Sequence, residues 1–311
     1  MTRERAAAGQ KRAIALPAAT LLVLVLSLYA AAPQAEQKPG PSRATSQPAD
    51  AAATRPADGS PRRCLRIATF NVLFRNIDLK AMTATAADAN ADILCLQETT
   101  PRSVSALKKR LGERYPHVKY RHGVLASGFA VFSRLPLEKV WYVKGRTAVF
   151  RTMMIDLKLD GRDVRIANVH LCPTLPRPRS NANQLLALLQ RTEDRRLREI
   201  KFIHGKLPTD RPTLIVGDMN TISTLPAGRY LTDRGYVDSY ATASLLPDLG
   251  STIRFRVGGV NVGLRIDYVL HTRDFRTLRS RILPSDGSDH SLVVSDLAWR
   301  KRRATTRPAE R

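Results

Sequence analysis

The sequence has 311 residues, 43% of them hydrophobic, so it is long enough to bury the core of one large domain or two small ones. It contains only three cysteines, which argues against a scaffold held by disulfides and predicts a core stabilised mainly by packing. The formal net charge is +24, which favours polyanionic partners such as nucleic acid or an anionic membrane.

The chain begins with a basic stretch that is followed by an apolar one. Basic residues are concentrated before position 13, and residues 13–32 are almost entirely apolar. This order is typical of a secretory signal, so we expect residues 1–35 to direct export. The apolar run is also long enough to span a bilayer. Two alternatives therefore stay open: a cleaved signal peptide that yields a secreted or periplasmic protein, and an uncleaved anchor that tethers the protein to the membrane.

Residues 36–62 are rich in Pro, Ala, Ser and Thr and contain almost no large apolar side chains. Such a segment buries too little apolar surface to offset the entropy of ordering it, which predicts an extended, disordered linker. We expect one folded domain over residues 63–300 and a short basic tail over residues 301–311.

Short apolar segments bounded by Gly, Pro, Asn or Asp recur through the expected domain and are typical of strands. Helical patterns lie between them, and the strongest has a Leu and Ile stripe beside a row of arginines. This mixture predicts an α+β layered fold with sheet inside and helices outside. The expected strands are 65–73, 92–97, 128–133, 152–159, 164–171, 213–216, 265–270 and 291–297, and the expected helices are 79–89, 104–114 and 180–206.

Polar side chains interrupt these segments where the apolar strands reach an edge or a loop. Such positions allow residues from distant parts of the sequence to meet in one site. Each residue alone is more often a turn residue, a helix cap or a satisfied polar group, so the set carries the argument. The set is Asn71, Glu98, His170, Asp218, Asn220, Asp267, Asp289 and His290.

The composition of this set favours a hard divalent cation. Carboxylate and amide oxygens are ligands that Mg²⁺ prefers, with Mn²⁺ or Ca²⁺ as alternatives, and a cation held in this way assists hydrolysis of phosphoesters. Structural zinc is disfavoured because paired Cys and His spacings are missing. The adjacent letters Ser288, Asp289 and His290 do not form a serine hydrolase triad, because contiguous residues cannot build that geometry. The sequence also lacks a phosphate-binding P-loop motif.

Six motifs occur in one order along the chain: T-F-N-V, L-Q-E-T, A-N-V-H-L, V-G-D-M-N-T, R-I-D-Y-V-L and S-D-H-S-L-V. On these motifs, residues 65–299 resemble the endonuclease/exonuclease/phosphatase superfamily, which includes deoxyribonuclease-I-like nucleases and neutral sphingomyelinases. The resemblance implies a four-layered α/β sandwich, in which two mixed β-sheets pack face to face and helices flank them. It also implies a metal-dependent hydrolase of phosphoesters.

The resemblance implies a metal side of the site at Asn71, Glu98 and Asp289, with Glu98 as a direct ligand. These residues come from three motifs far apart in the sequence. Asp289 is expected to add a further acidic group beside the metal.

The resemblance also implies the catalytic groups. Asp218 and Asn220 are expected to position and activate the attacking water and to hold a phosphate oxygen. His290 is expected against the scissile phosphate, with Asp267 accepting its other ring N–H. His170 corresponds to a histidine of the nuclease and sphingomyelinase branches, where abasic-site enzymes carry a tyrosine.

The substrate is predicted less directly. A nuclease is the first expectation, because the chain is basic and Arg177 and Arg179 are placed to contact a phosphate backbone. The alternative is a sphingomyelinase-like enzyme, or another lipid or small-molecule phosphodiesterase or phosphatase, acting at an anionic membrane surface. A silent binding module of the same fold is disfavoured by the complete polar set. Nothing in the sequence indicates an oligomer.

Overall fold

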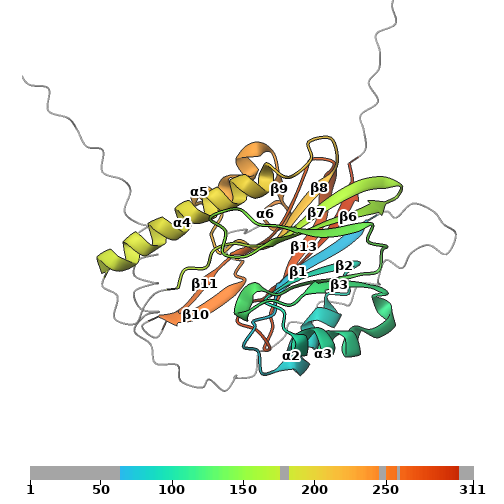
Figure 1. The fold of residues 1–311 in the computed structure, drawn as a ribbon, viewed down its shortest axis with the longest axis horizontal. Helices are drawn as coiled ribbons and strands as arrows, with labels where there is room; N and C mark the ends of the chain where they lie inside the picture. The colour runs from blue at the N-terminus through green and yellow to red at the C-terminus, as the bar shows by residue number, and fades with distance from the viewer. Residues whose placement is uncertain (1–63, 176–181, 245–249, 258–259, 301–311) are drawn as a thin grey trace, which may run out of the picture.

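The computed structural model describes residues 64–175, 182–244, 250–257 and 260–300 (Figure 1). The expected signal or anchor, the linker and the basic tail lie outside the described residues, as do Arg177 and Arg179. Within the described part, no helix combines the length and the apolar character that crossing a membrane requires.

The first sheet consists of six strands: β1 (Leu65–Asn71), β2 (Ile93–Gln97), β3 (His117–Arg121), β4 (Phe129–Ser133), β13 (Phe275–Leu283) and β14 (Leu292–Trp299). Their order in space is β13-β14-β1-β2-β4-β3, so β3 and β13 are the two edges. The central pair, β1 and β2, is parallel, and the other neighbours are antiparallel.

The second sheet also has six strands: β5 (Lys139–Val143), β6 (Thr152–Leu159), β7 (Arg162–His170), β8 (Thr213–Asp218), β9 (Val237–Asp238) and β12 (Asp267–His271). Their order is β5-β6-β7-β8-β12-β9, with β7 and β8 parallel. The expected strand pair 152–159 and 164–171 is the antiparallel pair β6 and β7. A separate hairpin is formed by β10 (Ile253–Val257) and β11 (Val260–Leu264).

The described helices are α2 (Leu79–Asp88), α3 (Pro101–Leu111), α4 (Ala182–His204), α5 (Pro226–Arg229) and α6 (Ser239–Ala243), with short 3₁₀ turns at Gly112–Arg114, Leu125–Ser127 and Thr232–Arg234. The start of α3 precedes the expected one because Thr100 and Ser103 form a capping box and Pro101 fits the first helical turn. Asp78 caps α2 by accepting the Ala81 N–H.

Apolar side chains from the inner faces of the two sheets form the central core. Ile67 and Phe129 of the first sheet belong to the same buried cluster as Ile155 and Val216 of the second. Cys95 lies in this cluster too, as its apolar sequence context predicts, and no disulfide joins described cysteines. Alternate residues of the same strands point outward, because successive side chains of a strand face opposite ways.

The outer faces of both sheets are covered by helices. One buried cluster packs α2 and α3 on the first sheet, and another packs Ile200 and Ile203 of α4 on the second. Figure 1 shows α4 on one side of the sheets and α2 and α3 on the other. This arrangement confirms the predicted α+β fold, in which two mixed sheets pack face to face between helices.

Candidate active site

The candidate site lies where two parallel strand pairs, one from each sheet, reach their carboxyl ends. In the first sheet β1 ends at Asn71, and Glu98 directly follows β2. In the second sheet β7 ends at His170, which lies opposite Asp218, the last residue of β8. Asp267 begins β12 and faces Asp218 across the antiparallel ladder. The structure therefore brings these five predicted residues together, and His290 joins them from the loop before β14.

Asn71 links the carboxylates of the two sheets. Its Nδ2 donates to Glu98 Oε1 and to Asp218 Oδ2, at 3.0 Å in each case. Its Oδ1 accepts the Leu73 N–H at 3.0 Å, which fixes the orientation of the amide. The second Glu98 oxygen accepts the Phe74 N–H at 3.1 Å. Burial nevertheless raises the pKa of Glu98, and these hydrogen bonds lower it only in part.

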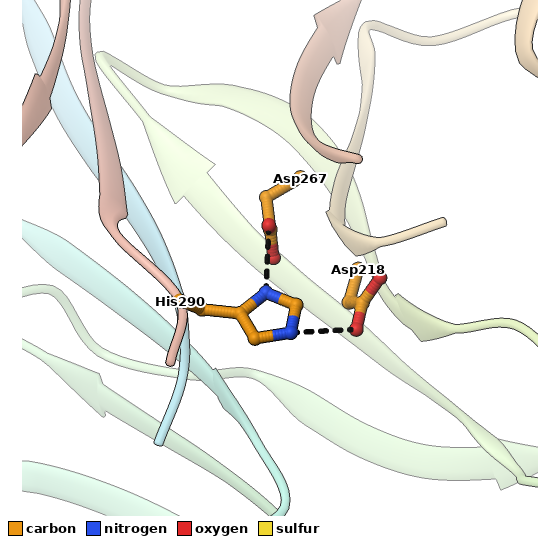
Figure 2. A group of neighbouring side chains, drawn as sticks. All are labelled: Asp218, Asp267 and His290. Carbon is orange, nitrogen blue, oxygen red and sulfur yellow. Dashed lines mark hydrogen bonds and ion pairs between the residues drawn. The ribbon is translucent and has the colours of Figure 1, made fainter. Parts of the chain in front are cut away.

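His290 is held between two aspartates (Figure 2). Its Nδ1 lies 2.8 Å from Asp267 Oδ2, and its Nε2 lies 3.8 Å from Asp218 Oδ2. Burial of the ring opposes protonation, but the charges of Asp267 and Asp218 outweigh it and raise the pKa of His290 to about 10. These charges favour the imidazolium form of the ring at neutral pH, which donates Nδ1–H to Asp267 and directs Nε2–H toward the centre of the site.

Two hydroxyl groups fix the backbone around this pair. Ser288 Oγ donates to the Asn71 carbonyl at 2.8 Å and accepts the His290 N–H at 3.1 Å. Thr252 Oγ1 accepts the N–H groups of Ile266 and Asp267 at 3.0 and 3.1 Å. The loop before β14 is therefore tied to the end of β1, and the start of β12 is tied to the loop before β10.

His170 occupies the other side of Asp218. Its Nε2 lies 3.6 Å from Asp218 Oδ2 and 3.8 Å from Glu98 Oε1. The ring stacks on Phe150, with centroids 4.1 Å apart and planes inclined by 18°. Burial lowers the pKa of His170, although the charge of Asp218 raises it. The two histidines thus differ: the two aspartates favour the charged form of His290, and burial favours the neutral form of His170.

Asn220 has a positional role in the structure. Its N–H donates to Asp218 Oδ1 at 2.8 Å, and its Nδ2 donates to the Leu171 carbonyl at 3.1 Å. The backbone φ of Asn220 is +52°, and that of Glu98 is +58°, a conformation that costs free energy for residues other than glycine. Glu98 directly follows β2, and Asn220 is the second residue after β8, so both lie at the ends of strands that enter the site. Contact of Asn220 with water or phosphate stays a prediction.

The remaining predicted residues are Asp289, Arg177 and Arg179. The Asp289 side chain is exposed, and its negative charge contributes to raising the pKa of both Glu98 and His290, so it lies near the site. Its role as a metal ligand stays a prediction. Arg177 and Arg179 lie outside the described residues, so their expected contact with substrate also stays a prediction.

The residues around Glu98 fit a divalent cation. Glu98 keeps 12% of its side chain exposed, burial raises its pKa, and the neighbouring carboxylates leave negative charge that a cation would neutralise. Asp218, Asp267 and His290 also offer ligand atoms within 4.8 Å of one another. A protonated imidazole has no lone pair to give a metal, however. The roles of this trio in proton transfer and charge stabilisation, and of Glu98 at the metal, stay predictions.

Sequence reasoning missed a buried polar bridge between the sheets. Gln97 Nε2 donates to Thr69 Oγ1 at 3.0 Å and to Asn168 Oδ1 at 2.6 Å, and Asn168 Nδ2 donates to the Leu96 carbonyl at 3.2 Å. Thr69 and Asn168 each stand two residues before a site residue, so their side chains share its face of the strand. That spacing is the signal that could have identified them.

Gly217 allows β7 and β8 to approach each other beside the site. Its φ is +136°, and a Cβ added there would lie 2.0 Å from the Val169 carbonyl oxygen. We expect Gly217→Ala to lower the free energy of unfolding by roughly 2–5 kcal/mol, since it combines backbone strain with overpacking. Urea unfolding measures this change. Gly161→Ala is the matched control, because Gly161 also has positive φ but has open space at its Cβ position.

Glu199 of α4 holds two loops from behind the site. Its Oε1 accepts the Val149 N–H at 3.1 Å, and its Oε2 accepts the Cys172 N–H at 2.8 Å. Val149 precedes the ring that stacks on His170, and Cys172 stands two residues after His170. Burial raises the pKa of Glu199, and these hydrogen bonds lower it in part. Glu199 is therefore a positioning residue for His170.

We expect Glu199→Ala to destabilise the protein by about 1–3 kcal/mol, because two backbone donors lose their acceptor. Thermal or urea unfolding measures the loss. Asp194→Ala is the matched control, since Asp194 is an exposed acidic residue of the same helix and should change stability by less than about 0.5 kcal/mol. Equal losses in the two variants would contradict the role of Glu199.

Comparison with known proteins supports the motif assignment. The sequence profile described as the Endonuclease/Exonuclease/phosphatase family matches residues 68–290. This span begins within β1 and ends at His290, so it includes the site residues described above. None of the curated proteins compared with the chain matches it.

Solved structures share the fold at low sequence identity. TDP2 from C. elegans superposes with a TM-score of 0.60 at 16% identity, over 76% of this chain and 75% of that one. An endonuclease/exonuclease/phosphatase family protein from Leptotrichia buccalis C-1013-b gives 0.56 at 17% identity, over 76% and 100% of the two chains. The endonuclease/exonuclease/phosphatase from Beutenbergia cavernae DSM 12333 gives 0.57 at 20% identity, over 76% and 72%. This chain belongs to the Endonuclease/Exonuclease/phosphatase family.

Proposed function

We propose that the protein is an exported, divalent-metal-dependent nuclease that hydrolyses the phosphodiester bonds of nucleic acid, with Mg²⁺ as the first choice of metal. The observation that carries the chemistry is the convergence of Asp218, His170 and the Asp267–His290 pair beside Glu98. The choice of nucleic acid is supported by the net charge of +24, because phosphate backbones attract basic proteins over long range.

The protein's own residues supply the proton transfers and part of the charge stabilisation. Asp218 Oδ2 accepts a hydrogen bond from Asn71 and faces both histidines, which suits it to take a proton from the attacking water. Burial and the nearby charge of Asp267 raise the pKa of Asp218, which strengthens it as a base. The His290 imidazolium directs Nε2–H to a phosphate oxygen, where negative charge grows. A bound divalent cation at Glu98 supplies further positive charge to the phosphate.

The reaction balances with one water molecule. The water oxygen forms a bond to phosphorus while the bond from phosphorus to the leaving sugar oxygen breaks. One proton of the water passes to Asp218, and the leaving oxygen takes up a proton from solvent or from a group of the site. No covalent intermediate with the protein is required, because water is the nucleophile.

A substrate panel tests the proposal. The purified full chain is incubated with Mg²⁺ and, in parallel, with plasmid DNA, RNA or sphingomyelin vesicles. We expect cleavage of nucleic acid, followed by gel electrophoresis, and intact lipid. Intact DNA and RNA together with cleaved sphingomyelin would overturn the nuclease assignment in favour of the lipid phosphodiesterase.

Export is tested separately, because it rests on residues 1–35 alone. Fractionation of expressing bacteria should place the protein outside the cytoplasm. N-terminal sequencing then distinguishes the two forms: a new N-terminus near residue 35 indicates a cleaved signal, and an intact one in the membrane fraction indicates an anchor. Recovery in the cytosol with residues 1–35 intact would contradict export.

A further inference from the structure

A pocket of about 440 Å³ opens between two loops beside the candidate active site. One loop joins β3 to β4 and the other joins β5 to β6. These strands lie at or next to the neighbouring edges of the two sheets, and Arg121 of β3 crosses from one sheet to the other, with its guanidinium carbon 5.4 Å from the centroid of the Tyr142 ring of β5. The pocket is lined mainly by Arg121, His122, Val124, Lys144, Phe150 and Arg151.

The walls of the pocket carry positive charge without a balancing acid. Residues 114–137 and 139–155, which contain both loops, include no Asp or Glu. Arg121, Lys144 and Arg151 are exposed, and none of them forms an ion pair with an acidic residue in the described part of the chain. The pocket is therefore a concave cationic surface, which concentrates anions more strongly than a flat one does.

Both walls of the pocket are attached to residues of the site. Phe150, which lines the pocket, stacks on His170 with centroids 4.1 Å apart. On the other wall, the Gly128 carbonyl accepts the Thr99 N–H at 3.2 Å, next to Glu98 in the sequence. A ligand that extends from the active site into the pocket would therefore stay in contact with protein.

The lining also indicates what kind of anion fits. Cationic side chains suit phosphate, and the apolar Val124 and the aromatic ring of Phe150 suit the face of a nucleobase or sugar. A small free anion would leave the apolar wall without contact. A nucleotide matches both kinds of surface.

We propose that this pocket binds a nucleotide of a nucleic-acid strand next to the scissile phosphate, with Arg121 and Lys144 contacting its phosphate groups. The inference rests on the proposed nuclease function and adds a subsite to it. It predicts that polymeric substrates bind more tightly than small phosphodiesters, because a small diester occupies the active site and leaves the pocket empty.

The test measures binding of a labelled single-stranded oligonucleotide to the full chain in EDTA, by fluorescence anisotropy at several salt concentrations. We expect the double variant Arg121→Ala/Lys144→Ala to weaken binding by about tenfold or more. The slope of log Kd against log salt should fall by about 1.4, the value for two lost phosphate contacts on a single strand.

The control variant is Arg273→Ala/Arg276→Ala, which removes the same charge. Both arginines are exposed, and Arg276 lies on β13, at the opposite edge of the first sheet from β3. We expect the control to keep most of the affinity and slope of the parent chain. Equal losses in the two double variants would overturn the subsite, because net charge alone would explain them. Thermal melts of both variants exclude misfolding as the cause.

Two further measurements separate the subsite from the proposed function. If the parent chain cleaves DNA and the pocket variant has an unchanged KM for DNA, the assignment of the pocket as a subsite is contradicted and the nuclease function is kept. If the pocket variant loses oligonucleotide binding but the parent chain cleaves no nucleic acid, the pocket is confirmed as a nucleotide-binding site and the nuclease function is overturned. Loss of binding to phosphatidylserine vesicles with unchanged oligonucleotide binding would overturn the subsite in favour of a membrane contact.

Discussion

His290→Ala is expected to reduce kcat for phosphodiester cleavage by a factor of about 10² to 10⁴, the range over which a positioned proton donor or acceptor contributes. The imidazolium is held by Asp267 at 2.8 Å and is the positive group that the chain itself offers to a phosphate oxygen. Without it, Asp267 and Asp218 would leave their negative charges unopposed next to the substrate. Initial rates on a fluorescent oligonucleotide with saturating Mg²⁺ measure the loss.

The matched control is His117→Ala. His117 begins β3, is half-buried, and lies level with Ile93 at the start of β2, whereas Glu98 follows the end of β2. We expect its activity to stay within about twofold of the parent chain, since surface substitutions of this kind have small effects. Full activity of His290→Ala would show that another group stabilises the charge on the phosphate. It would also contradict the catalytic role of the Asp267–His290 pair.

The second large effect is expected for Glu98→Gln. Removing the charge while keeping the shape should lower activity by roughly 10² to 10⁴, because charge stabilisation by a metal is worth several kcal/mol. The Mg²⁺ concentration that gives half-maximal activity should also rise. Stability should change little, because removing a charge whose burial is unfavourable offsets the loss of one acceptor: both Glu98 oxygens accept N–H hydrogen bonds, and Gln offers one oxygen. A Mg²⁺ titration of activity, together with a urea unfolding curve, measures both quantities.

Glu113→Gln serves as the control for this prediction, because Glu113 is exposed and lies in the short turn after α3. Its Mg²⁺ dependence should match that of the parent chain. If Glu98→Gln kept the parent Mg²⁺ dependence and activity, the metal would have to be held elsewhere, and the trio of Asp218, Asp267 and His290 would be the alternative.

The strands that build the site were predictable from sequence because they are buried on both faces. β2 and β8 are buried throughout and read as continuous apolar runs. The edge strands β3 and β13 were missed, since charged residues alternate along their exposed faces and weaken the apolar signal. Buried strands are therefore recognisable from their apolar residues, whereas exposed edge strands with the same backbone conformation are not.

The polar residues at strand ends could be selected from sequence because they interrupt apolar runs within recognisable motifs. Their partners could not. Phe150 stacks on His170, and Glu199 holds the loops on either side of that contact, yet neither residue departs from the pattern of its own segment. Gln97 and Asn168 meet across 71 residues of sequence. Such pairings exist only after the sheets have packed.

Metal dependence of nucleic-acid cleavage is the most direct measurement of the central claim. The full chain, His290→Ala and Glu98→Gln are each assayed on DNA and RNA, first in EDTA and then after addition of excess Mg²⁺. We expect no cleavage in EDTA, cleavage by the parent chain once Mg²⁺ is restored, and losses of about 10² or more in both variants. Undiminished cleavage in EDTA, or parent-like rates in both variants, would contradict the central claim.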